Sequence, residues 1–324
     1  MELTPRHRLE IVSGRAHPSL AEEIADCLDV KLAEANLREF PDGELHCRYG
    51  NSIRGVDLFI VQTHAAPVND SIMEMLIMID AAKRASAKRI TAVCPYYGYS
   101  RQDRKATGRE PITAKLIADL VSAAGADRIV SVDLHSGQIQ GFFDGPVDHL
   151  TATPVLVDYL RREAVANMVV VAPDAGRVKV AERFSQQLGM DLALVHKRRP
   201  PGGASDQVEA LHVVGEVEGR CCVIIDDQIG TAGTVVAAAE RLLEQGATDV
   251  WAMATHAILA GPALDRLNSA PISRVVVTNT LPISEDRRID KMEVISVARI
   301  IADAIDAVFE ETSVSDIFGG QNLL

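Results

Sequence analysis

The 324-residue chain is 47% hydrophobic and 24% charged, a composition typical of globular proteins, and its length favours two domains. A formal net charge of −12 opposes a nucleic-acid-binding function, because such proteins need a basic surface to displace phosphate counterions. No run approaches the ~18 consecutive apolar residues of a membrane helix and the first residues lack the apolar core of a signal peptide, so we expect a cytoplasmic protein without a membrane partner.

Short runs rich in valine and isoleucine alternate with longer amphipathic segments along the chain. In chain order, we expect strands at residues 58–61, 90–93, 129–132, 168–171, 222–225 and 275–277. The alternation is typical of βαβ units, which build a mostly parallel sheet with helices on both faces. Such sheets bind ligands beyond the carboxyl ends of their strands, so the residues that follow each run are the first candidates for a site.

Residues 125–135 and 246–256 resemble each other at a constant offset of 121 residues, and each stretch follows a helical segment rich in alanine and leucine. The repeat indicates two copies of one α/β domain, with a chance likeness of two helix-to-strand joints as the alternative. A new helix near residue 151 indicates the domain boundary. The expected organisation is an N-terminal domain at 1–150, a C-terminal domain at 151–308 and a tail at 309–324 that packs back on the N-terminal domain.

The clearest local pattern follows the strand expected at 222–225, where two aspartates precede a turn rich in glycine and threonine. Its candidate ligand-binding residues are Asp226, Asp227, Gln228, Ile229, Gly230, Thr231, Ala232, Gly233 and Thr234. Glycine lets the backbone curl around an oxyanion, threonine hydroxyls add donors, and the N–H groups of the next helix point at a bound phosphate. The paired carboxylates suit adjacent ribose hydroxyls, and an ordinary turn capped by threonine is the alternative. A P-loop is excluded because the chain has no Gly-Lys dipeptide.

Three further segments carry charge at expected strand ends or in loops. Residues 101–105 follow the strand at 90–94 and offer guanidinium donors for a triphosphate, with a solvated charged loop as the alternative. His135 comes directly after the strand at 130–134, where a lone histidine is more often structural than a ligand. Residues 196–206 set three cations beside a stretch rich in proline and glycine, which suits a mobile loop that closes over a diphosphate or an exposed basic hairpin.

These segments occur in the order found in one enzyme family. From about residue 8 to residue 320 the chain resembles the ribose-phosphate diphosphokinases, and its Asp-Asp pair followed by Thr-x-Gly-Thr resembles the ribose-5-phosphate loop of type I phosphoribosyltransferases. The other segments that carry the resemblance are residues 40–44, 95–105, 132–135, 141–144 and 172–176. The resemblance implies an α/β fold of two similar phosphoribosyltransferase-like domains. The chain departs from the family at Gln228 and Gly230, where methionine and aspartate are common.

The resemblance implies transfer of the diphosphoryl group of Mg-ATP to the C1 hydroxyl of D-ribose 5-phosphate, giving 5-phospho-α-D-ribose 1-diphosphate and AMP for nucleotide, histidine and tryptophan biosynthesis. Residues 226–234 would bind the ribose 5-phosphate. The implied ATP-binding residues are Arg101, Gln102 and Asp103, with Phe40, Asp42 and Glu44 reaching the adenine from a neighbouring subunit. The implied cofactor is Mg²⁺, held by His135 and Asp174, and the implied catalytic residues of the closing loop are Lys197 and Arg199.

The resemblance also implies a homo-oligomer, a hexamer built from dimers, that phosphate activates and ADP inhibits. The implied effector-site residues are Ser52, Arg54, Ser313 and Ser315, whose segments read in isolation as polar turns. One alternative is a phosphoribosyltransferase, which would share residues 226–234 but has no use for residues 101–103 on a second domain. The other is a noncatalytic regulatory homologue, which typically alters catalytic positions that are present here.

Overall fold

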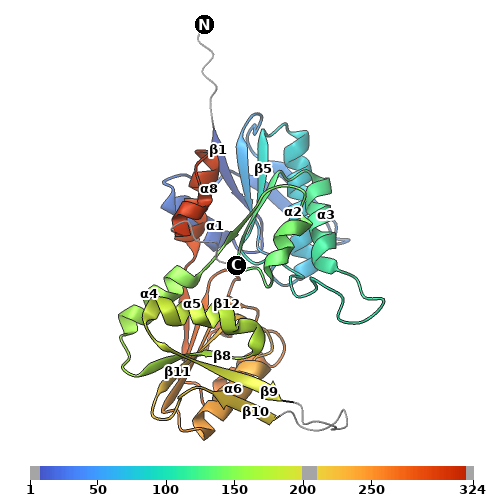
Figure 1. Cartoon of the computed structure of the whole chain (residues 1–324). Coiled ribbons are helices and arrows are strands. Elements are labelled where there is room, and N and C mark those ends of the chain that lie inside the picture. The colour runs from blue at the N-terminus through green and yellow to red at the C-terminus, as the bar shows by residue number, and fades with distance from the viewer. Residues whose placement is uncertain (1–7, 199–209, 319–324) are drawn as a thin grey trace. The chain divides into compact units, whose positions relative to one another are not determined.

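The computed structural model describes residues 8–198 and 210–318, and their contacts form two compact units (Figure 1). The first unit takes its described residues from Met1–Thr151, Thr280–Pro282 and Ser296–Leu324, and the second from Ala152–Asn279 and Ile283–Ile295. Each unit contains a mostly parallel sheet flanked by helices, which confirms the expected fold class. Among the described residues, no helix is both long and apolar enough to cross a membrane.

The first unit is built on a parallel sheet with the strand order β1-β4-β5-β6-β7. Its strands are β1 (Leu9–Ser13), β4 (Asp57–Val61), β5 (Arg89–Cys94), β6 (Arg128–Val132) and β7 (Val147–Leu150). All residues of β4 are buried, because helices cover the sheet on both faces, and this explains its uninterrupted apolar run. A separate antiparallel hairpin consists of β2 (Ala35–Glu39) and β3 (Leu45–Tyr49).

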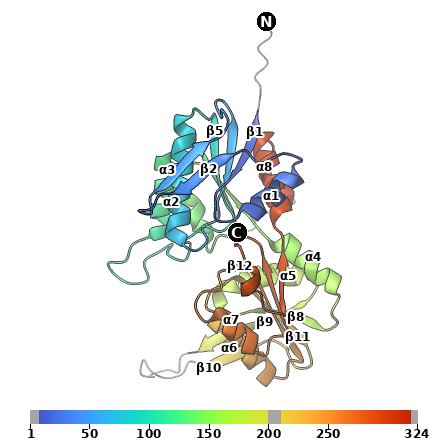
Figure 2. The same ribbon diagram turned by 180° about the vertical axis from the view of Figure 1, so that it is seen from behind.

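Helices cover the two faces of this sheet in pairs, with α2 and α3 together on one face and α1 and α8 together on the other (Figures 1 and 2). The helical segments are α1 (Pro18–Cys27), α2 (Val68–Arg84), α3 (Thr113–Ala124), α8 (Ala298–Phe309), and the short 3-10 turns η1 (Gly137–Phe142) and η4 (Val314–Phe318). Alternate side chains of β4 pack against the helices on opposite faces of the sheet. Leu58 and Ile60 join the core cluster that includes α2 and α3, whereas Phe59 is buried outside that cluster.

The second unit has a sheet with the strand order β10-β9-β8-β11-β12-β13-β14, parallel except for the antiparallel pair of β9 and β10. Its strands are β8 (Met168–Ala172), β9 (Asp191–Arg198), β10 (Ala210–Val214), β11 (Cys221–Ile229), β12 (Asp249–Ala257), β13 (Arg274–Thr278) and β14 (Met292–Ile295). Its helical segments are α4 (Thr153–Glu163), α5 (Val178–Leu188), α6 (Gly233–Glu244), α7 (Ala263–Ser269), and the 3-10 turns η2 (Ala175–Arg177) and η3 (Glu285–Arg287). Buried side chains of α6 and α7, among them Leu242 and Leu267, form one core cluster with the sheet.

The expected strands and the internal repeat are both present in the structure. The six apolar runs lie within β4, β5, β6, β8, β11 and β13. In the first unit α3 precedes β6, and in the second α6 precedes β12; the strands begin at Arg128 and Asp249, which are 121 residues apart. After each helix a glycine with positive φ turns the chain into the strand, Gly125 at 119° and Gly246 at 88°. The sequence repeat therefore corresponds to a repeated helix-glycine-strand unit, once in each compact unit.

The C-terminal helix α8 groups with the first unit, whereas the expected C-terminal domain extended to residue 308. Helix α8 packs against α1, and both helices bury aliphatic side chains, Ile301 and Ile305 on α8 and Leu20 and Ile24 on α1. Burial of these apolar stripes accounts for the return of the chain to the first unit. The described part of the expected tail, with η4 next to α8, belongs to that unit as well.

Candidate functional site

The Asp-Asp pair of the second unit lies inside β11, because this strand continues to Ile229, beyond the expected run at 222–225. The turn follows, and Gly233 and Thr234 are the first residues of α6. Ala232 precedes α6 with a left-handed φ of 61°, and no side chain caps the helix there. The structure therefore does not support the alternative of a turn capped by threonine, and the first turn of α6 retains the geometry that binds anions.

Arg177 pairs with both aspartates of β11, a contact that no sequence pattern predicted. Its Nε lies 3.3 Å from Asp226 Oδ1, and its Nη2 lies 2.9 Å from Asp227 Oδ2. The arginine ends η2, directly after β8, and β8 is the parallel neighbour of β11. The sequence shows an arginine three residues after Asp174, but only the order of the strands places this arginine beside the two aspartates.

The paired carboxylates are electrostatically coupled. Burial, with added repulsion and hydrogen bonding from Asp227, raises the pKa of Asp226 to about 8, while the charge of Arg177 acts in the opposite direction. The side chains of Asp226 and Asp227 are only 19% and 9% exposed, so the guanidinium is needed to offset the charge of two carboxylates this close together.

Asp226→Asn is expected to change the pH dependence of stability. A raised pKa means that the folded state binds this proton more tightly than the unfolded chain does, so the stabilisation is complete below about pH 3.8 and is lost as the pH rises through about 8. Asparagine stays neutral, so the variant should gain unfolding free energy relative to the parent between about pH 5 and pH 8. Urea unfolding of both proteins across this range measures the difference, and a difference that does not change with pH would contradict the assignment.

Asp174 follows β8 and begins the turn η2. Its Oδ1 accepts a hydrogen bond from the N–H of Gly176 at 2.8 Å, which fixes the carboxylate at the carboxyl end of the strand. Its second oxygen has no protein partner within the described ranges. The arrangement suits a hard cation, since Mg²⁺ is usually held by one or two carboxylates together with waters and phosphate oxygens.

In the first unit, the segment after β5 carries the residues expected to bind ATP. We call residues 96–103 the nucleotide loop. Arg101 and Gln102 are exposed, while hydrogen bonds shape the backbone around them: Gln102 N–H donates to Tyr99 O at 2.8 Å, and Ala114 N–H donates to Gln102 O at 3.2 Å. Tyr99 has a left-handed φ of 60°, a strained conformation for a bulky residue. The loop is therefore a defined turn with exposed charged groups.

His135 follows β6, the parallel neighbour of β5, so it lies at the same sheet edge as the nucleotide loop. Two hydrogen bonds from backbone N–H groups hold the segment before it: Asp133 N–H donates to Leu150 O at 2.9 Å, and Leu134 N–H donates to the His149 side chain at Nε2, at 2.8 Å. Gln138 Nε2 then donates to Asp103 Oδ2 at 2.7 Å. The structure therefore joins the segment of His135 directly to the nucleotide loop.

Phe40, Asp42 and Glu44 form the exposed tip of the β2–β3 hairpin. The tip is closed by hydrogen bonds from Phe40 N–H to Glu44 O at 2.8 Å and from Gly43 N–H to Phe40 O at 2.9 Å, and Gly43 has a φ of 92°. Within the described chain, no hydrogen bond or ion pair joins these three residues to the nucleotide loop. Their expected role, in the ATP site of a neighbouring subunit, stays a prediction.

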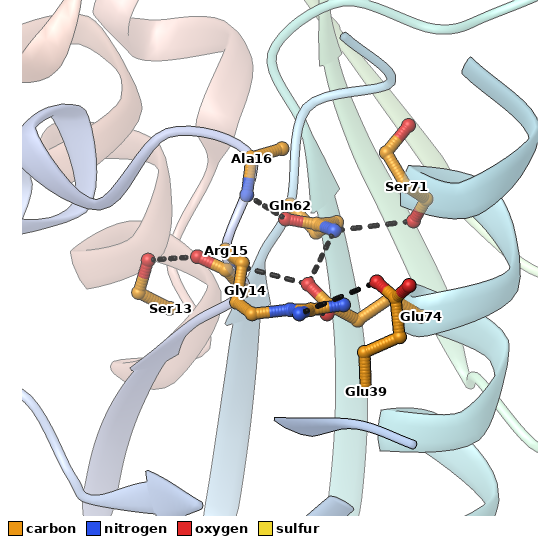
Figure 3. A network of polar contacts seen from close by, with 8 residues as sticks. All are labelled: Ser13, Gly14, Arg15, Ala16, Glu39, Gln62, Ser71 and Glu74. Atoms are coloured by element: carbon orange, nitrogen blue, oxygen red, sulfur yellow. Dashed lines mark hydrogen bonds and ion pairs between the residues drawn. The ribbon is translucent and has the colours of Figure 1, made fainter. Parts of the chain in front are cut away.

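A polar network connects the tip end of β2 in this hairpin with the ends of β1 and β4 (Figure 3). Arg15 donates to the buried carboxylate of Glu74 from its backbone N–H, at 2.7 Å, and from its Nε. Its Nη1 lies 4.0 Å from Glu39 Oε2, at the end of β2. Gln62, directly after β4, donates to the same carboxylate at 3.0 Å. The network fixes the segment from which the chain continues towards α2.

Lys197 belongs to β9, where it is paired with Leu211 of β10. We expected residues 196–206 to form a mobile loop or an exposed basic hairpin; residues 196–198 are the last residues of β9, which continues to Arg198 because no proline or glycine occurs before Pro200. Arg199 and the rest of the expected loop, through residue 206, lie outside the described residues. The catalytic roles of Lys197 and Arg199 stay predictions.

The residues expected to bind effectors lie in two exposed segments of the first unit. Ser52 and Arg54 precede β4, while Ser313 and Ser315 lie at the start of η4 with their hydroxyl oxygens 2.8 Å apart. No hydrogen bond or ion pair between described residues joins the two segments.

Comparison with known proteins identifies the family. The model of the N-terminal domain of ribose phosphate pyrophosphokinase matches residues 9–125, and that of the phosphoribosyl synthetase-associated domain matches residues 197–319. The ribose-phosphate pyrophosphokinases of Streptomyces coelicolor and Mycobacterium bovis are 52% and 53% identical to this chain, covering 99% and 97% of both it and their own lengths. The chain belongs to the ribose-phosphate pyrophosphokinase family.

Ribose-phosphate pyrophosphokinase is another name for the diphosphokinases that the motifs resemble, so that prediction is confirmed. The crystal structure of phosphoribosylpyrophosphate synthetase from Mycobacterium smegmatis matches with 51% identity and a TM-score of 0.88, covering 94% of this chain and 99% of that one. A match over whole chains assigns the pyrophosphokinase family, whereas the roles of single residues stay predictions.

Proposed function

We propose that this chain transfers the diphosphoryl group of Mg-ATP to the C1 hydroxyl of ribose 5-phosphate, giving 5-phospho-α-D-ribose 1-diphosphate and AMP. Membership in the ribose-phosphate pyrophosphokinase family over nearly the whole length carries this conclusion. The turn between β11 and α6 agrees with it, since it offers an uncapped helix N-terminus beside two carboxylates.

Ribose 5-phosphate binds, in this proposal, along residues 226–234. The N–H groups at the start of α6 and the hydroxyls of Thr231 and Thr234 hold the 5-phosphate. Asp226 and Asp227 accept hydrogen bonds from the ribose hydroxyls, with Arg177 balancing their charge.

ATP binds, in this proposal, at the nucleotide loop, where Arg101 supplies a bidentate cation for the phosphates and Gln102 and Asp103 contribute polar contacts. Phe40, Asp42 and Glu44 contact the adenine bound in the ATP site of a neighbouring subunit, which requires a homo-oligomer, proposed here as a hexamer built from dimers. The exposed tip of the β2–β3 hairpin supports such a contact, since Phe40 is 37% exposed.

Mg²⁺ is the proposed cofactor, with His135 and Asp174 as its protein ligands. The second oxygen of Asp174, which has no protein partner in the described ranges, supports the assignment. When bound, the ion supplies charge neutralisation on the phosphate oxygens and helps to orient them.

In the proposed reaction the anomeric hydroxyl oxygen attacks the β-phosphorus and releases its proton, the bond from that phosphorus to the α-phosphate oxygen breaks, and AMP leaves with that oxygen. Catalysis of such a transfer depends mainly on positioning and on neutralising the nonbridging oxygens. Lys197 and Arg199 provide that positive charge, and no covalent enzyme intermediate is needed.

Incubation of the protein with Mg-ATP and ribose 5-phosphate tests the proposal. We expect AMP and phosphoribosyl diphosphate in equal amounts. A phosphoribosyltransferase would instead consume phosphoribosyl diphosphate with a base, and a noncatalytic homologue would form neither product. Either of those results would overturn the proposed function.

The effector site is proposed at Ser52, Arg54, Ser313 and Ser315, whose hydroxyls and guanidinium are suitable donors to phosphate. Because one site would serve both ligands, Arg54→Ala is expected to weaken phosphate activation and ADP inhibition together while sparing the rate without effectors. Titration of phosphate and ADP against the variant and the parent measures both responses. Unchanged responses to both ligands would remove this segment from the effector site.

A further inference from the structure

The segment after β4 is held rigidly before it reaches the nucleotide loop. Gln62 is buried and donates from Nε2 to Glu74 Oε1 at 3.0 Å and to Ser71 O at 3.2 Å, and its Oε1 accepts the N–H of Ala16 at 3.2 Å (Figure 3). A Cβ at Gly14 would lie 2.1 Å from Gln62 Oε1, so glycine is required for this close approach. These contacts therefore fix the position of Gln62, to which the next two residues are attached.

Those two residues, Thr63 and His64, contact the nucleotide loop through three hydrogen bonds. Tyr96 N–H donates to Thr63 Oγ1 at 3.1 Å, and His64 N–H donates to Tyr96 O at 3.1 Å. The third uses the imidazole ring: Gly98 N–H donates to His64 Nδ1 at 2.9 Å. A Cβ on Gly98 would lie 2.9 Å from His64 Cβ and 3.2 Å from its Nδ1, so the loop backbone lies directly against the histidine.

His64 stays uncharged near neutral pH, so its Nδ1 can accept the hydrogen bond from Gly98 at all times. The residue is completely buried, and burial lowers its pKa to about 3, so the ring stays neutral near neutral pH. Since Nδ1 accepts, the proton resides on Nε2, and that atom has no hydrogen-bond partner among the described residues. The unsatisfied N–H at Nε2 destabilises the fold, so it does not explain why a histidine occupies this position. The residue contributes the acceptor at Nδ1 and the packing of its ring, whose centroid lies 5.6 Å from that of the Tyr97 ring.

We propose that His64 is a positioning residue that determines the course of the nucleotide loop and thereby places Arg101 to Asp103 for ATP. Directly beyond Gly98 the chain turns at Tyr99, whose carbonyl accepts the N–H of Gln102 at 2.8 Å. A shift at Gly98 is therefore passed through one short hydrogen-bonded turn to the residues that contact the nucleotide. The proposal rests on the proposed function, because ATP is the ligand assigned to this loop.

Steady-state kinetics of two variants test this role. His64→Asn keeps an acceptor on the same branch as Nδ1, whereas His64→Leu has a similar volume and no acceptor. We expect the leucine variant to raise the KM for ATP by about tenfold, the effect of one lost hydrogen bond, and to leave the KM for ribose 5-phosphate within about twofold. The asparagine variant should recover most of the ATP affinity.

Gly98→Ala changes the loop residue of the contact between His64 and Gly98. It tests the proposal independently if the leucine variant does not fold. The added methyl should also raise the KM for ATP selectively, because it displaces the loop from His64. Equal rises of both KM values, or an asparagine variant as impaired as the leucine variant, would overturn the proposal. Absence of phosphoribosyl diphosphate formation by the parent protein would instead overturn the proposed function, so the two failures are distinguishable.

Discussion

Alanine at Lys197 or at Arg199 is expected to lower kcat by roughly two to three orders of magnitude and to leave the KM for ribose 5-phosphate nearly unchanged. The reason is that charge on the nonbridging oxygens changes during the transfer, and a cation that stabilises the transition state affects kcat more than ground-state binding. Steady-state kinetics with each substrate varied in turn measure both parameters.

Arg198→Ala is the matched control, since it removes the same charge from the intervening position of β9, to which no role is assigned. The control should retain most of the parent rate. A raised KM with unchanged kcat in the Lys197 or Arg199 variant would show that the cation binds the ground state, and the assigned role would be wrong.

Arg177→Met is expected to lower kcat/KM for ribose 5-phosphate by on the order of a hundredfold, because charge-assisted hydrogen bonds to partly buried carboxylates are worth roughly 2–3 kcal/mol. Without the guanidinium, Asp226 and Asp227 repel each other and hold their proton more tightly, so they become poorer acceptors for ribose hydroxyls. The KM for ATP should change little. Arg177→Lys should recover part of the loss, since an ammonium keeps the charge but not the two-pronged geometry.

Lys179→Met serves as the control for Arg177→Met, because Lys179 is an exposed cation near the start of α5. We expect the control to resemble the parent in both KM values and in stability. If Arg177→Met leaves the KM for ribose 5-phosphate unchanged, the arginine has only a structural role beside the aspartates.

The strands that could be predicted from the sequence are those buried on both faces. β4 and β8 consist of buried residues throughout, so their apolar runs are continuous. The hairpin of β2 and β3 contains polar, half-exposed residues and gives no such run. β9 was missed for a related reason, since it ends in the polar residues His196, Lys197 and Arg198. Periodicity identifies a strand only where burial constrains its composition.

The sequence alone determined the fold class, the duplication and the family, because apolar runs, a repeat at constant offset and ordered motifs can all be recognised along the chain without knowing which elements are in contact. The tertiary structure alone showed that Arg177 pairs with Asp226 and Asp227, that His64 supports Gly98, and that α8 packs with α1. These contacts join residues that are distant in sequence. They depend on which strands are neighbours and on which apolar helix faces bury each other, and no local pattern specifies either.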